Sequence, residues 1–131
     1  MPQSRHILLV DDHADVRAVL THLITRLCPT ATIAQAVHGV DALQSIEEHE
    51  PYLIITDCQM PIMDGLEFVR ALRAQGAVMP IVAISSDPRL SDAVRKAGAD
   101  AFLLKPFQLG QLTQQLYALA PGCREIHAVG E

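Results

Sequence analysis

Three aspartates stand directly after apolar runs in this sequence. Asp11 and Asp12 follow the run Ile7–Val10, and Asp57 follows the run Leu53–Thr56. A carboxylate at the end of a buried strand is costly unless something binds it. Three such groups therefore indicate chemistry at these positions rather than packing alone.

Two further apolar runs end in groups that suit an anion. Ile81–Ile84 is followed by Ser85, a hydroxyl donor, and Phe102–Leu104 is followed by Lys105, a mobile ammonium. If the aspartates converge, two carboxylates about 4 Å apart repel by roughly 4 kcal/mol at an effective dielectric near 20. Either one carboxyl takes up a proton or a cation joins them, and oxygen donors of this kind suit Mg²⁺. The set predicts phosphoryl transfer in which Asp57 attacks phosphorus and becomes an acyl phosphate.

Alternating elements must position these groups. Apolar runs predict strands over residues 7–10, 53–56, 81–84 and 101–104, and residues 32–37 predict a more polar strand that suits a sheet edge. Apolar residues at helical spacing predict a helix after each strand. This alternation is typical of the α/β class, a doubly wound parallel sheet with helices on both faces. Ligands bind such sheets beyond the carboxyl ends of the strands. Acids after the first and third strands favour the strand order 2-1-3-4-5, in which those two strands flank the crevice.

Caps and breakers set the expected boundaries. Asp64 is the predicted N-cap of the third helix. Asp87-Pro88 reads as the N-cap and first-turn proline of a short fourth helix that ends near Gly98. Residues 6–120 are expected to form one domain, and 121–131 a loose C-terminal tail.

Composition excludes several classes of protein. The 131 residues carry a formal net charge of −5, which argues against direct nucleic-acid binding. No apolar stretch is long enough for a membrane span, and no signal peptide precedes the first strand. Cys28, Cys58 and Cys123 show no metal-ligand spacing and no disulfide framework. A reducing cytoplasm is therefore the expected location.

In order, these residues resemble the receiver domain of bacterial two-component response regulators. The resemblance runs from about His6 to Leu119. It rests on Asp11-Asp12, Asp57 with Met60-Pro61 and Met63-Asp64-Gly65, Ser85, and Lys105-Pro106-Phe107. It implies a flavodoxin-like receiver fold whose phosphoryl donor is a histidine kinase or a histidine phosphotransfer domain. The chain would then be no enzyme beyond its own Mg²⁺-dependent phosphorylation and dephosphorylation, and a monomer or weak dimer.

The resemblance also assigns roles to single residues. Asp57 is the expected phosphoacceptor. Asp12, Asp57 and the backbone carbonyl of Gln59 are expected to bind Mg²⁺, with Asp11 acting through water. Lys105 would pair with the phosphoryl group, in front of a cis Lys105–Pro106 bond. Ser85 would move to bond that group while Phe102, the switch aromatic, turns inward.

Some positions depart from the family's pattern or vary within it. The switch aromatic is Phe rather than Tyr, and residues 86–97 look short, so the fourth helix is expected to be trimmed or shifted. Gln59 and Asp87 match variable positions and are hypothesised to control the approach of water to the phosphoryl group. His13 is predicted to be a solvated loop histidine, with contact to the metal as the alternative. Cys58 is predicted to pack.

Two other functions are alternatives to the receiver. A phosphatase of the haloacid-dehalogenase type also uses an aspartyl phosphate, but it carries an acid two residues after the nucleophile. Here His13 and Ala14 occupy those positions. An unphosphorylated interaction module would not need the full set of strand-end groups. No stretch is left for a DNA-binding output domain, so the signal is expected to leave by protein contact, from a free-standing regulator or a receiver of a larger sensor kinase.

Overall fold

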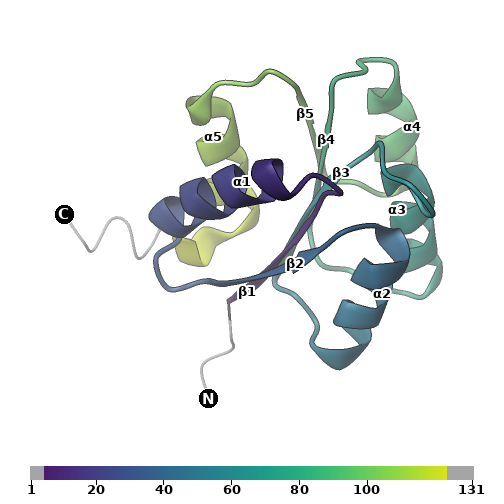
Figure 1. The fold of residues 1–131 in the computed structure, drawn as a ribbon, viewed down its shortest axis with the longest axis horizontal. Coiled ribbons are helices and arrows are strands. Elements are labelled where there is room, and N and C mark those ends of the chain that lie inside the picture. The colour runs from purple at the N-terminus through teal and green to yellow at the C-terminus, as the bar shows by residue number, and fades with distance from the viewer. Residues whose placement is uncertain (1–4, 124–131) are drawn as a thin grey trace.

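The computed structural model describes residues 5–123, in which strands and helices alternate throughout (Figure 1). The strands are β1 (His6–Val10), β2 (Thr32–Ala36), β3 (Leu53–Asp57), β4 (Ile81–Ser85) and β5 (Ala101–Leu104). The helices are α1 (Ala14–Leu27), α2 (Gly39–Glu48), α3 (Gly65–Ala74), α4 (Leu90–Ala97) and α5 (Leu109–Leu119). Within this part of the chain, no helix is both long enough and apolar enough to cross a membrane.

The strands form one parallel sheet in the order β2-β1-β3-β4-β5, which confirms the predicted order and fold class. Val10 lies opposite Thr56 in the register, and Asp57 lies opposite Ile84. The strands therefore end almost level with one another. Asp57 and Ser85 are the last residues of β3 and β4, so the polar groups stand at a single edge of the sheet.

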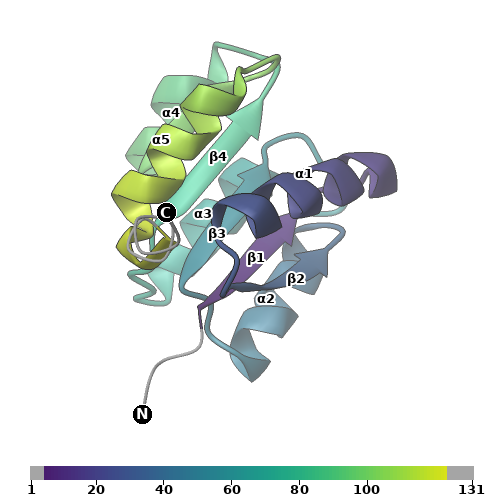
Figure 2. The same ribbon diagram turned by 90° about the vertical axis from the view of Figure 1, so that its left-hand side faces the viewer.

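Helices cover both faces of the sheet, as the continuous apolar strands require. Figures 1 and 2 show α1 and α5 on one face and α2, α3 and α4 on the other. Successive strand residues point to opposite faces, so Leu9 and Ile55 pack with α1 and α5, while Leu8 and Ile54 pack with the other three helices. Edge strand β2 is more polar and more exposed, as predicted.

The start of α3 agrees with the sequence, and the start of α4 does not. The Glu67 backbone N–H donates to Asp64 Oδ1 at 2.9 Å, and the Asp64 N–H donates to Glu67 Oε1 at 3.2 Å, which is a capping box. The prediction that Asp87-Pro88 starts the fourth helix is wrong, because α4 begins at Leu90. The Leu90 N–H donates to the Asp87 carbonyl three residues earlier, so Asp87 opens a separate tight turn instead.

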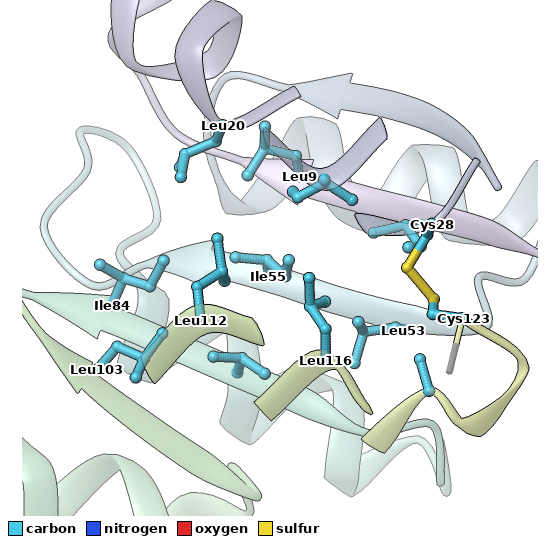
Figure 3. Packing of buried hydrophobic residues seen from close by; sticks show 14 of the residues in the cluster. Leu9, Leu20, Cys28, Leu53, Ile55, Ile84, Leu103, Leu112, Leu116 and Cys123 are labelled. Atoms are coloured by element: carbon cyan, nitrogen blue, oxygen red, sulfur yellow. A yellow bond between two sulfur atoms is a disulfide. The ribbon is translucent and has the colours of Figure 1, made fainter. Parts of the chain in front are cut away.

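A disulfide joins Cys28 to Cys123, and the expectation of no disulfide is wrong for this structure. Cys28 caps the end of α1, and Cys123 lies just after α5; both are 1% exposed (Figure 3). The fold brings together two cysteines that are 95 residues apart, a separation that no local sequence pattern encodes. Pro121–Cys123 are helical, so this part of the expected tail is not loose; residues 124–131 lie outside the described part of the chain.

Candidate functional site

The carboxyl ends of β1 and β3 carry the acidic residues of the candidate site. Asp11 is 2% exposed and its backbone N–H donates to the Ala36 carbonyl at 3.1 Å, which fixes it to neighbouring β2. Arg17 Nη1 donates to the Asp11 carbonyl at 2.8 Å from the first turns of α1. The acid pair is thus held between a strand end and a helix start.

His13 contacts both aspartates of the pair. Its Nδ1 lies 3.2 Å from Asp11 Oδ1 and 3.3 Å from Asp12 Oδ1, and its backbone N–H donates to Asp11 Oδ1 at 2.9 Å. The hydrogen bond to Asp11, followed by the charge of Asp12, raises the pKa of His13. The side chain is 61% exposed, so the predicted solvation is correct, yet this histidine also belongs to the acidic cluster.

Asp57 is buried at the end of β3, where it is 5% exposed. Lys105 reaches it from the loop after β5, with Nζ 3.1 Å from Asp57 Oδ1. Burial raises the pKa of Asp57, and Lys105 offsets part of that rise, while the charge of Asp11 adds to it. The backbone N–H of Gln59 also lowers the pKa of this carboxylate.

Two carboxylate oxygens of the site are buried and receive no hydrogen bond within the described residues. They are Asp12 Oδ1, which has His13 Nδ1 at 3.3 Å, and Asp57 Oδ1, which has the Lys105 ammonium at 3.1 Å. Buried polar atoms that receive no hydrogen bond are rare and need an explanation. Carboxylate oxygens of this kind suit a hard divalent cation such as Mg²⁺.

Ser85 lies at the same edge of the sheet, but its side chain is hydrogen-bonded to the Asp87 backbone. It is fully buried, and its Oγ accepts the Asp87 backbone N–H at 3.0 Å. The Lys105 N–H donates to the Ser85 carbonyl at 2.8 Å, which ties the two strand ends together. The Lys105–Pro106 peptide bond is cis, as predicted.

Phe102 lies away from this edge, within β5. It is opposite Ala83 in the register, and Leu104 is opposite Ser85, so Phe102 and Ser85 point to the same face of the sheet. Phe102 is half-buried against the cluster beneath α2, α3 and α4. Its partial cover agrees with the expectation for an edge strand.

A cavity of about 540 Å³ opens beside the acidic residues. Asp12, Gln59, Asp64 and Asp87 border it, and apolar side chains of the 58–66 segment and of α4 line the rest. Asp87 also holds the exposed Arg89 guanidinium, with both of its carboxylate oxygens 3.0 Å from Arg89 nitrogens. The two variable positions therefore do face one hollow next to the acid pair.

Gly65 sets how closely α3 approaches β3. A Cβ on this glycine would lie 2.4 Å from the Asp57 carbonyl oxygen and 2.7 Å from the Cys58 Cα. The Gly65 N–H donates to the Cys58 carbonyl at 2.9 Å. The structure therefore explains the glycine of the Met63-Asp64-Gly65 motif, because only glycine fits there.

Cys58 is buried directly after Asp57. Burial, with the negative charge of Asp57, raises the pKa of Cys58 to about 12. A thiol with so little thiolate is unreactive. The packing interpretation of Cys58 therefore agrees with its surroundings.

Known proteins share both the sequence and this fold. The family model of the response regulator receiver domain matches residues 7–117. The transcriptional regulatory protein PrrA of Mycobacterium tuberculosis is 40% identical over 118 residues, covering 88% of this chain and 50% of that protein. The two-component response regulator PhoP of Pseudomonas aeruginosa is 36% identical over 116 residues, with 86% and 50% covered. The chain thus spans about half the length of these curated relatives.

Solved structures give the same result. The chemotaxis response regulator CheY4 of Vibrio cholerae superposes with a TM-score of 0.79 at 28% identity, covering 89% of this chain and 99% of that one. The family match covers most of the chain, and it agrees with the sheet order and with the acidic strand ends. The chain belongs to the response regulator receiver domain family of two-component systems.

Proposed function

We propose that Asp57 of this receiver domain accepts a phosphoryl group from a phosphohistidine in a Mg²⁺-dependent reaction. The observation that carries this proposal is the Asp57 carboxylate itself. It is buried, its Oδ1 accepts no hydrogen bond among the described residues, and Lys105 stands 3.1 Å away. A buried carboxylate oxygen that faces an ammonium and accepts no hydrogen bond suits a nucleophile.

The residues that would hold Mg²⁺ are Asp12, Asp57 and the backbone carbonyl of Gln59, with Asp11 acting through water. Asp12 Oδ1 and Asp57 Oδ1 support this set, because they receive no hydrogen bond within the described residues and offer anionic oxygen ligands at one edge of the sheet. When bound, the ion would screen the charge of the incoming phosphoryl group. Phosphoryl transfer requires little beyond such positioning and charge neutralisation.

In the proposed step, a carboxylate oxygen of Asp57 forms a bond to phosphorus. The P–N bond of the phosphohistidine breaks, and its electron pair stays on the departing imidazole. The Lys105 ammonium pairs with the phosphoryl oxygens. Water later cleaves the acyl phosphate, returning the Asp57 carboxylate and inorganic phosphate. Gln59 and Asp87 border the cavity beside Asp12, which supports their proposed control over the approach of that water.

Ser85 and Phe102 form the proposed switch. In the structure Ser85 Oγ accepts a hydrogen bond from the Asp87 backbone, so its hydroxyl hydrogen is free to be donated to a phosphoryl oxygen. Movement of Ser85 would open space on the face where Phe102 is half-buried. Phosphate would thereby favour the state with both side chains drawn inward, a shift of population that changes the partner-binding surface.

The proposed donor is a histidine kinase or a histidine phosphotransfer domain, and the downstream partner is a protein. We place the receiver in residues 6–120, as a monomer or weak dimer in the cytoplasm. In that compartment the Cys28–Cys123 pair would be held largely as thiols, since cytosolic reductants oppose disulfides.

The test is intact-mass analysis after incubation with Mg²⁺ and a small phosphodonor. One added phosphoryl group per chain is expected, and Asp57→Asn should remove it. Asp64→Asn is the matched control, since it makes the same change at a nearby helix cap and asparagine caps well.

Labelling that survives Asp57→Asn would overturn the proposal. Chelation of Mg²⁺ should abolish the label in the unaltered chain. Release of many phosphates per chain would instead indicate a hydrolase of the haloacid-dehalogenase type.

A further inference from the structure

We propose that His13 adds an imidazole nitrogen to the acidic site, so that the site binds a first-row transition-metal ion of the Ni²⁺ or Zn²⁺ kind as well as Mg²⁺. The inference rests on the metal site of the proposed function and extends it to the identity of the ion. Within residues 5–123, Asp11, Asp12 and His13 bring one ligand atom each to within 4.8 Å of one another.

The distances around His13 Nδ1 match the edges of a coordination shell. Metal–ligand bonds of about 2.1 Å place neighbouring ligands about 3.0 Å apart in an octahedron and about 3.4 Å apart in a tetrahedron. Nδ1 lies 3.2 Å from Asp11 Oδ1 and 3.3 Å from Asp12 Oδ1. The nitrogen therefore needs little movement to share an ion with either carboxylate.

The His13 imidazole is not used by the helix that it begins. His13 is the N-cap of α1, but its side chain caps no backbone N–H. His38, the N-cap of α2, provides the contrast, since its Nδ1 accepts the Asp41 N–H at 3.1 Å. Two histidines in equivalent helix positions thus differ, and only the first turns its ring to the acids.

A third carboxylate gives a further sign of a cation at this place. Asp57 is 5% exposed, and among the described residues its Oδ1 accepts no hydrogen bond and has only the Lys105 ammonium, at 3.1 Å, beside it. Carboxylates alone suit Mg²⁺, whereas imidazole suits nickel, copper and zinc. A site that combines both kinds of donor should therefore bind the softer ions more tightly than carboxylates alone would.

Calorimetric titration of the apo protein with Ni²⁺ and, separately, with Mg²⁺ tests the proposal. The buffer should be at about pH 8, where ordinary imidazoles are neutral. His13→Ala is expected to weaken Ni²⁺ binding at least about tenfold, in line with the loss of one ligand interaction, and to leave Mg²⁺ binding within about twofold. His22→Ala is the matched control, because it removes another exposed histidine of α1.

Asp12→Asn should abolish the binding of both ions, which assigns the Ni²⁺ to this site. Unchanged Ni²⁺ affinity in His13→Ala, an equal loss in His22→Ala, or Ni²⁺ binding that survives Asp12→Asn would each overturn the proposal. Mg²⁺ binding and Asp57 labelling of His13→Ala report on the proposed function separately. If His13→Ala keeps its Mg²⁺ binding and Asp57 labelling and its Ni²⁺ affinity is also unchanged, only the role of His13 is rejected, and the proposed function is unaffected.

Discussion

Asp57 is ionised in a place that disfavours its charge. Burial raises its pKa above the ordinary value, so the folded state binds a proton more readily than the unfolded state does. Such a group contributes fully to the stability of the folded state below the ordinary pKa near 3.8. This contribution is lost as the pH rises through the pKa of the folded state. At neutral pH the carboxylate therefore lowers the free energy of unfolding.

Asp57→Asn should stabilise the domain at neutral pH in the absence of metal. The expected gain is about 1 kcal/mol, the usual size of a relieved functional-site constraint. Urea unfolding in EDTA measures it, and a smaller gain at about pH 4 is expected because the native carboxyl is then partly protonated. Equal or lower stability of the variant at neutral pH would contradict this reasoning.

Single residues differ in how far the sequence could reveal them. Asp57 and Lys105 could be found because each directly follows an apolar run, and strand ends of a parallel sheet share one edge. The contact of His13 with both aspartates could not be predicted, because it depends on a side-chain direction at the start of α1. The Cys28–Cys123 disulfide could not be predicted either, because the two cysteines come together only in the folded chain.

At the scale of elements, the start of α3 packs so closely against the end of β3 that Gly65 leaves no room for a Cβ beside the Asp57 carbonyl. Gly65→Ala should lower the free energy of unfolding by about 1–3 kcal/mol, since its Cβ would meet the Asp57 carbonyl and cannot move aside. The displaced strand end should also weaken Mg²⁺ binding. Denaturant unfolding and calorimetry measure the two effects.

Gly110→Ala is the control for that substitution. Gly110 lies in α5 and a Cβ there meets nothing within 4 Å, so this change should be neutral or stabilise the protein by up to about 1 kcal/mol. Equal effects of the two substitutions would argue against the proposed steric cause.

The start of β1 and the end of α2 meet through two histidines. The His6 and His49 rings stack with centroids 4.2 Å apart, and burial, with the nearby charge of His49, lowers the pKa of His6. The unfolded chain therefore binds a proton first as the pH falls. Stability is complete above the ordinary pKa of 6.5 and is lost as the pH falls through the folded pKa.

Urea midpoints should therefore fall between about pH 7.5 and about pH 5.5. His6→Gln should flatten this dependence, because it removes the titrating ring. His22→Gln, at an exposed position of α1, should leave the slope as it is. A slope that is the same in all three proteins would assign the dependence to other groups.

Elements were predicted well where one signal dominated. Continuous apolar runs predict four of the strands, and the more polar run of residues 32–37 predicts β2, all to within a residue or two; Asp64 marks the start of α3. The start of α4 was missed because two local preferences compete at Asp87-Pro88. Asp87 binds the backbone and side chain of Arg89, which favours a separate turn over a helix cap.

At the scale of the whole molecule, the Cys28–Cys123 disulfide closes most of the chain into one loop. Removing it should lower the free energy of unfolding by about 4.7 kcal/mol, the chain-entropy value for a loop of nearly 100 residues. Urea unfolding with and without reductant measures the difference. Cys28→Ser/Cys123→Ser should not respond to reductant, and a native protein that does not respond either would refute the prediction.

That bond also changes how the domain would bear a mechanical load. All strands except β1 and all helices except α1 lie between the two cysteines. Tension applied to the ends would pass from residue 28 to residue 123 through sulfur, so the segment between the two cysteines could not be drawn out into an extended chain. With the bond intact, stretching would release roughly 330 Å less chain than with free thiols, since the 95 intervening steps extend by about 3.5 Å each.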